Sequence, residues 1–286
     1  MIMKKRKNWL TALLSMFVLA SCSLEEDTSS FSTPDNFYQT KEQCLSALNS
    51  CYIPLNGTYN YTLFIATESC TDLMYINSGT LDSRLDISPA KPRHGETVWN
   101  NGYKGVMYCN AAINGIENSP LEENEKLPLL GEGKIMRAFY YYDLATIFQN
   151  IPLIDKPMEV VDKSTITKSS KEEVMNFILK DLNTAIAEPN LPNAKSLPTS
   201  EIGRITKEAA MAFRARVLMF YGNYGEALKD LKAVVESGSY ELVDDYEKLF
   251  NNATEGYMSK ESVFITLRSY ICLLYTSPSP RDYAAS

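Results

Sequence analysis

Histidine is almost absent from this chain of 286 residues, which contains His94 alone. A zinc site built on two or three histidines is therefore excluded, and a Ser-His-Asp hydrolase would have to use that one residue. Basic residues are also outnumbered: the formal charge is −7, and removing the first 21 residues, which hold four basic and no acidic side chains, lowers it to −11. Because such an acidic chain repels phosphate backbones, we expect no nucleic acid partner.

The sequence also lacks an apolar run long enough to span a membrane, which takes about 20 residues. Its longest candidate, residues 9–20, is shorter and follows a basic segment at Lys4–Lys7. A basic segment followed by a short apolar run is typical of a secretory signal peptide. We place this signal peptide at residues 1–21.

Cys22 stands directly after this segment. The preceding Leu19-Ala20-Ser21 resembles the bacterial lipobox, in which small residues precede a cysteine that is acylated. We expect Cys22 to carry a lipid that anchors the protein to the membrane, with residues 22–34 as a tether. The alternative is an ordinary cleavage site with a chance cysteine.

An acidic run, Glu25-Glu26-Asp27, follows the cysteine. It resembles the tag that sends Bacteroidetes lipoproteins to the outer face of the outer membrane. A solvated charge run with no sorting role is the alternative.

Paired cysteine motifs are missing as well, since no CxxC occurs. Cys44 and Cys51 are seven residues apart, so on one continuous helix they would lie about 10 Å apart, beyond disulfide reach. Cys70 and Cys109 sit in apolar helical patterns and are expected to be small buried residues. A disulfide involving these two is left open.

Helical periodicity dominates the rest of the chain. Capping boxes at Thr40 and Ser170 mark two helix starts, and Pro54 is expected to close the first of these helices. Apolar residues three and four apart predict further helices. The expected ranges are 40–53, 63–74, 97–117, 129–148, 171–188 and two helices within 206–238.

The last two helices occupy about 34 residues, the length of a tetratricopeptide repeat, and Gly222 to Ala227 is similar to that repeat's turn. Gly238 is suited to end the second helix in the left-handed conformation. Residues 77–96 are expected to form a long loop, because Gly79, Pro89, Pro92 and Gly95 interrupt any regular pattern. A short strand is expected at residues 262–266. The predicted fold class is all-α, with tetratricopeptide-like helical pairs, long irregular loops and minor β-structure.

Several segments taken together resemble the SusD/RagB family of Bacteroidetes nutrient-uptake lipoproteins. They begin with Phe37-Tyr38-Gln39-Thr40 and the set Trp99, Tyr103, Asn110 and Ile113, and their order and spacing are typical of that family. In the segment Gly131 to Leu144, this chain has Gly131-Glu132-Gly133 and Met136 where the family usually has other residues, and this departure is expected to affect packing only. The remaining segments are Gly131 to Leu144, Ile151-Pro152-Leu153, Gly203 to Ala210 with Ala215-Arg216, and Glu236 to Leu242.

The resemblance implies a surface-anchored outer-membrane lipoprotein that captures oligosaccharide and passes it to a SusC-like, TonB-dependent transporter. It implies neither catalysis nor a cofactor, and no catalytic or metal-ligating constellation stands out: chance explains the carboxylate pairs, and Gly131 to Lys134 lacks the spacing of a phosphate-binding loop. The competing interpretation is a tetratricopeptide-type scaffold that binds a protein or peptide.

The resemblance covers residues 35–271 as an incomplete, N-terminal helical region of the family. Family chains continue further, whereas residues 272–286 resemble translated sequencing-adapter read-through and are expected to be non-native. The chain is therefore expected to be truncated.

Sugars are bound by aromatic rings that stack on their C–H faces and by polar groups that bond to their hydroxyls. The long loop and its borders offer both kinds of side chain, whereas Arg137 and Tyr140–Tyr142 are expected to be core residues. The candidate ligand-binding residues are Tyr75, Asn77, Asp82, Arg84, His94 and Trp99.

Overall fold

A computed structural model provides the structure of the chain. Contacts divide it into two compact units, Met1–Phe37 and Tyr38–Ser286, and nearly everything described belongs to the second. The predicted signal peptide, the predicted tether that begins at Cys22 and the 272–286 tail lie outside the described residues. The structure describes residues 37–72, 74, 88–158, 161, 163–187, 191–198, 201, 203–247 and 260–265.

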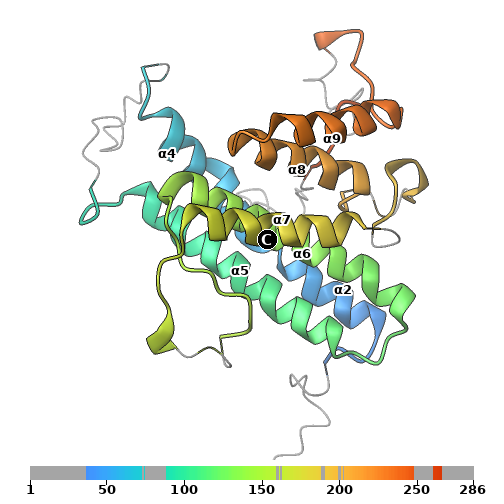
Figure 1. Cartoon of the computed structure of the whole chain (residues 1–286), viewed down its shortest axis with the longest axis horizontal. Coiled ribbons are helices and arrows are strands. Elements are labelled where there is room, and N and C mark those ends of the chain that lie inside the picture. Colours follow the sequence, from blue (N-terminus) through green and yellow to red (C-terminus); the bar gives the residue numbers. More distant parts are fainter. Residues whose placement is uncertain are drawn as a thin grey trace, which may run out of the picture. The chain divides into compact units, whose positions relative to one another are not determined.

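The described residues are mostly α-helical, which confirms the predicted all-α class (Figure 1). A π-helical turn, η2 (Thr58–Thr62), joins α3 to α4, and two short 3₁₀ turns, η4 (Lys163–Thr165) and η5 (Ala194–Ser196), lie in connections. The α-helices are α2 (Lys41–Ser50), α3 (Ile53–Gly57), α4 (Leu63–Glu68), α5 (His94–Glu117), α6 (Glu123–Phe148), α7 (Lys171–Ile186), α8 (Lys207–Phe220) and α9 (Tyr224–Glu236).

Helix starts follow the predicted caps. The Thr40 hydroxyl accepts from the Gln43 N–H while the Gln43 side chain accepts from the Thr40 N–H, so both halves of the capping box form. The same reciprocal pair forms between Ser170 and Glu173 at the start of α7. Each box satisfies two backbone N–H groups that the helix itself leaves without partners.

Two prolines do not mark helix borders where the sequence predicted, since Pro54 was expected to end a helix and Pro128 to precede one. α2 ends at Ser50, and Pro54 falls in the first turn of α3, where a missing N–H costs nothing. Pro128 lies inside α6, which begins at Glu123, five residues before it. The acidic Glu123 and Glu125 stabilise the first turn of α6, and burial of the long helix offsets the hydrogen bond that Pro128 removes.

The border between the predicted loop and α5 also differs. α5 begins at His94 rather than near Thr97, because a turn in which the Gly95 N–H donates to the Pro92 carbonyl leads directly into the helix. Residues 77–87 of the predicted loop lie outside the described residues. α4 is shorter than predicted, ending at Glu68.

The predicted strand at residues 262–266 is wrong for its described part, since residues 262–265 are irregular. These residues line a pocket together with residues of α6 and α8 instead of pairing with a strand. In the described part of the chain, bridges occur only as two isolated pairs, Ser88 with Lys91 and Pro152 with Lys168.

The helices pack as neighbours in sequence, each antiparallel hairpin against the next. α6 contacts α5 on one side and α7 on the other, α7 contacts α8, and α8 pairs with α9, while α2 rests on α5 and α6 (Figure 1). This is the pairing of a tetratricopeptide-like array. Among the described residues, no helix is both long and apolar enough to cross a membrane.

Glycines let α5 approach α6 closely. A Cβ added at Gly105 would run into the Tyr140 ring, and one added at Gly102 would lie 2.8 Å from a methyl carbon of Leu144. Tyr140 is buried, and its hydroxyl donates to the Cys51 carbonyl at 2.6 Å. The ring therefore occupies the space that a side chain at position 105 would need.

Candidate functional site

Four of the six predicted ligand-binding residues, Tyr75, Asn77, Asp82 and Arg84, lie outside the described residues. The other two, His94 and Trp99, are on α5, where the predicted loop joins it. Five residues on a helix correspond to a rotation of about 140°, so the two side chains leave α5 in different directions. The structure therefore does not bring His94 and Trp99 together on one face.

Trp99 belongs to an aromatic cluster at the junction of α5 and α6. Its ring lies 4.8 Å from the Tyr103 ring and 5.1 Å from the Phe148 ring, which it meets edge to face. All three side chains are partly buried. The Tyr103 hydroxyl donates to the Pro152 carbonyl at 2.8 Å, and burial raises the pKa of Tyr103. The cluster thus combines packing with partly accessible aromatic surface next to the end of the predicted loop.

A second group of residues, centred on Arg137, is buried. Arg137 makes a bidentate ion pair with Asp181 of α7 at 2.7 and 2.8 Å and donates to the Asn110 side chain of α5 at 2.9 Å. The Asn110 amide donates in turn to the Ile154 and Lys156 carbonyls. This network joins three helices to the segment after α6, which confirms that Arg137 is a framework residue.

The tyrosines beside Arg137 are also framework residues, as predicted. The Tyr141 hydroxyl donates to the Ile154 carbonyl at 2.8 Å and accepts from the Ile154 N–H at 2.7 Å. Tyr140, Tyr141 and Tyr142 are all buried. These three tyrosines of the motif from Gly131 to Leu144 therefore help to hold the array together.

Glu132 of the same motif is a buried acid with two partners. It accepts from the Tyr52 hydroxyl at 2.5 Å and pairs with Arg204 at 3.0 Å. Burial raises the pKa of Glu132, while Arg204 and Tyr52 act in the opposite direction. Since both partners occupy the carboxylate, Glu132 is no candidate for an acid or base that works on a ligand.

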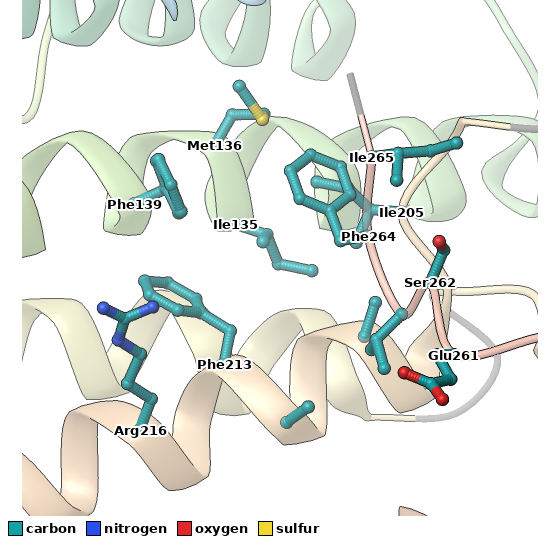
Figure 2. Close-up of a pocket in the computed structure, with 13 residues that line it drawn as sticks. Ile135, Met136, Phe139, Ile205, Phe213, Arg216, Glu261, Ser262, Phe264 and Ile265 are labelled. Carbon is teal, nitrogen blue, oxygen red and sulfur yellow. The ribbon is translucent and has the colours of Figure 1, made fainter. Parts of the chain in front are cut away.

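A pocket of about 440 Å³ opens between α6, α8 and the segment 261–265 (Figure 2). Its walls are mostly apolar, with the rings of Phe139 and Phe213 only 5.2 Å apart. Figure 2 shows the charged side chains Arg216 and Glu261 at opposite sides of it. A pocket of this size and lining suits an apolar or aromatic group, with few polar atoms to meet sugar hydroxyls.

Asp143 lies near this pocket, one turn of α6 beyond Phe139. It accepts from the Tyr59 hydroxyl at 2.6 Å. Burial raises the pKa of Asp143 to about 6, although the Tyr59 hydrogen bond and the nearby Arg216 guanidinium oppose this rise. The Arg216 guanidinium lies 5.9 Å from the centre of the Tyr142 ring. The pKa of the Asp143 carboxyl group is therefore well above the ordinary value for an aspartate.

The structure gives no sign of metal or disulfide chemistry in its described part. No group of three or more potential ligands could hold a metal ion there. Cys44, Cys51 and Cys109 are buried free thiols, and the Cys70 side chain is partly buried.

The pocket and Asp143 were missed by reasoning from the sequence. The pocket walls come from α6, α8 and a segment some 45 residues further along the chain, so no local pattern reveals it. For Asp143, a carboxylate within a run of aromatic residues was the available signal.

A family model described as "Starch-binding associating with outer membrane" matches residues 24–219. SusD-like protein P38 of Formosa agariphila is 28% identical to this chain, over 89% of this chain and 51% of its own length. A SusD-like carbohydrate-binding protein from Bacteroides fragilis has a similar structure, with a TM-score of 0.68 and 26% identity over 80% of this chain and 46% of its own.

Surface glycan-binding protein A from Bacteroides fluxus is similar too, with a TM-score of 0.68 and 26% identity over 79% of this chain and 50% of its own. The chain spans about half the length of the curated relatives it matches.

Proposed function

Because this chain belongs to the SusD-like family, we propose that it is the helical part of a glycan-binding lipoprotein that captures oligosaccharide at the cell surface without cleaving it. The family match over residues 24–219 is the observation that carries this proposal. It is supported by relatives whose names describe carbohydrate or surface glycan binding. In this proposal the captured oligosaccharide passes to a SusC-like, TonB-dependent transporter.

We propose that the ligand is met at the start of α5, by the segment Tyr75 to Trp99 together with parts of the full-length protein beyond this chain. The partly buried rings of Trp99, Tyr103 and Phe148 support this choice, because aromatic surface stacks on sugar C–H faces. The buried polar groups support this position of the site indirectly. Arg137 and Glu132 already pair with other side chains of the protein and therefore have no need of a ligand as a partner.

The test is a glycan array with the full-length protein, followed by calorimetry on the glycan that binds. Tyr75→Ala and Asp82→Ala should each weaken binding by about tenfold, the effect of losing roughly 1.4 kcal/mol of contact energy. Tyr108→Ala is the matched control, since Tyr108 lies on α5 about two and a half turns beyond Trp99 and contacts Lys104. Its affinity should stay within about twofold of the parent.

Three results would contradict the proposal. Release of reducing sugar from the bound glycan would indicate an enzyme. Tight binding of a peptide with no glycan affinity would favour the scaffold function. If Tyr75→Ala and Tyr108→Ala lost affinity equally, the proposed position of the site would be wrong, whereas the proposal that the protein binds glycan would stand.

A further inference from the structure

Two residues hold a backbone conformation that residues other than glycine rarely adopt. Gln149, directly after α6, has φ 65° and ψ −98°, and Arg93, directly before α5, has φ 55° and ψ −131°. Among the described residues other than glycine, these two alone have a positive φ. Strain of this kind is costly, and it collects at binding sites and switches.

Both strained residues border the aromatic cluster at the junction of α5 and α6. Gln149 follows Phe148, whose ring meets the Trp99 ring edge to face at 5.1 Å. A Cβ added at Gly95, two residues after Arg93, would lie 3.8 Å from the same Phe148 ring. The strain is therefore concentrated where the proposed function places the glycan.

The end of α6 does not explain why residue 149 is a glutamine. The Gln149 N–H donates to the Ala145 carbonyl at 3.0 Å, and this bond ends the helix. Glycine would make the same bond without strain and is the usual residue at such a helix end. Gln149 is exposed, and its side-chain amide makes no hydrogen bond within the described part of the chain. The described fold thus gives no reason for an amide at this position.

The residues after Gln149 fix its backbone. Ile151 is buried, and its carbonyl accepts from the Ser169 N–H at 3.0 Å. The Pro152 carbonyl accepts from the Tyr103 hydroxyl of α5 at 2.8 Å. A strained residue persists when its surroundings determine its conformation in this way. A side chain on a fixed backbone also loses less freedom when it binds a ligand.

We infer that Gln149 is a sugar-binding residue, which recognises hydroxyl groups of the saccharide unit that stacks on the aromatic cluster. This inference rests on the proposed function. The glutamine amide offers an acceptor and two donors, so it can bond to two adjacent hydroxyls of one sugar ring. The Cα atoms of Phe148 and Gln149 are consecutive and so about 3.8 Å apart, which lets the ring and the amide reach the same unit. The preferred glycan therefore carries adjacent free hydroxyls on that unit.

The experiment measures the affinity of the full-length protein, by calorimetry, for the oligosaccharide that binds on the glycan array. Gln149→Gly and Gln149→Ala should each weaken binding about tenfold, because both remove the amide. The two variants differ in their backbone, since only glycine relieves the strain. Gln149→Gly should therefore raise the melting temperature by about 2 °C, whereas Gln149→Ala should leave it within about 1 °C of the parent.

Asn118→Gly is the matched control. Asn118 is an exposed amide residue that directly follows α5, at the end away from Trp99, and its φ is −89°. Glycine relieves no strain there and adds freedom to the unfolded chain. The variant should bind within about twofold of the parent and should melt at the same temperature or slightly lower.

Two results would overturn the inference while the parent still binds glycan. If both Gln149 variants kept the affinity of the parent, the amide would make no contact with the sugar. If Gln149→Gly lost affinity and Gln149→Ala kept it, position 149 would act through the rigidity of its backbone. A parent protein that binds no oligosaccharide on the array would instead contradict the proposed function, and the inference would fall with it.

Discussion

Buried charged residues in this protein are held by matched partners. Arg137 and Asp181 are both nearly inaccessible, and their bidentate pair is completed by the Asn110 side chain and the Asp155 carbonyl. Removing one member of such a pair leaves an uncompensated charge, which typically costs about 3–5 kcal/mol. These positions therefore support the fold even though their side chains are of the kinds that often bind ligands.

Asp143 is different, because its partners do not fully compensate its burial. Its pKa is about 6 in the folded protein against an ordinary value of 3.8. The folded state therefore holds this proton more tightly than the unfolded state does. The corresponding stability is fully present below pH 3.8 and is lost as the pH rises through about 6.

Asp143→Asn should consequently stabilise the protein at pH 7.5 and have little effect near pH 4. The asparagine keeps an oxygen that can accept from Tyr59. The shift corresponds to at most about 3 kcal/mol, and we expect about 1–2 kcal/mol because the site is near solvent. Urea denaturation at both pH values measures the difference.

Asp244→Asn is the control for the Asp143 variant, because it makes the same change of charge on an exposed side chain. Its stability should follow that of the parent at both pH values. A difference between Asp143→Asn and the parent that stays constant with pH, or that has the opposite sign, would show that the Asp143 carboxyl group is not penalised by burial.

At the scale of the elements, helix starts marked by a capping box could be predicted, as could the ends of α5 and α6, whereas helix borders near prolines could not. Capping boxes at Thr40 and Ser170 are local, so the sequence alone reveals them. Pro54 and Pro128 were misjudged because the effect of a proline depends on its position within a helix, and that position depends on packing. The start of α5 at His94 depends on a turn that no propensity marks.

The contact between α5 and α6 leads to a prediction for Gly105. Alanine normally favours a helix over glycine by about 1 kcal/mol, but at Gly105 its Cβ would meet the fixed ring of Tyr140. Gly105→Ala should therefore destabilise the protein by about 1–3 kcal/mol. Gly225→Ala on α9, where nothing lies within 4 Å, should be neutral or stabilising. Thermal melting of both variants decides the matter, and equal effects would mean that the α5–α6 contact is looser than described.

At the scale of the whole molecule, the fold class and family could be read from the sequence, because helical period and motif order extend along the chain. The pocket could not be read in the same way, because its walls come from α6, α8 and residues 261–265, which are far apart in the chain. An apolar helix face looks the same in sequence whether it is covered or open.

We propose that Cys22 is acylated and that this lipid anchors the molecule to the membrane. Cys22→Ala should abolish incorporation of a labelled fatty acid and shift the protein from the membrane to the soluble fraction. Cys70→Ala, which changes a partly buried thiol on the folded part, should leave both unchanged. Persistent labelling of Cys22→Ala would exclude Cys22 as the anchor. Protease treatment of intact cells tests separately whether the protein faces outward.

The position of Trp99 has a spectroscopic consequence. The sequence contains two tryptophans, Trp9 and Trp99, and a chain that begins after residue 21 retains only Trp99. Its indole sits between Tyr103 and Phe148 at the start of α5, so the intrinsic fluorescence of such a chain comes from one known place. A change in its emission maximum or in quenching by iodide would report directly on the solvent around this end of α5, without any added dye.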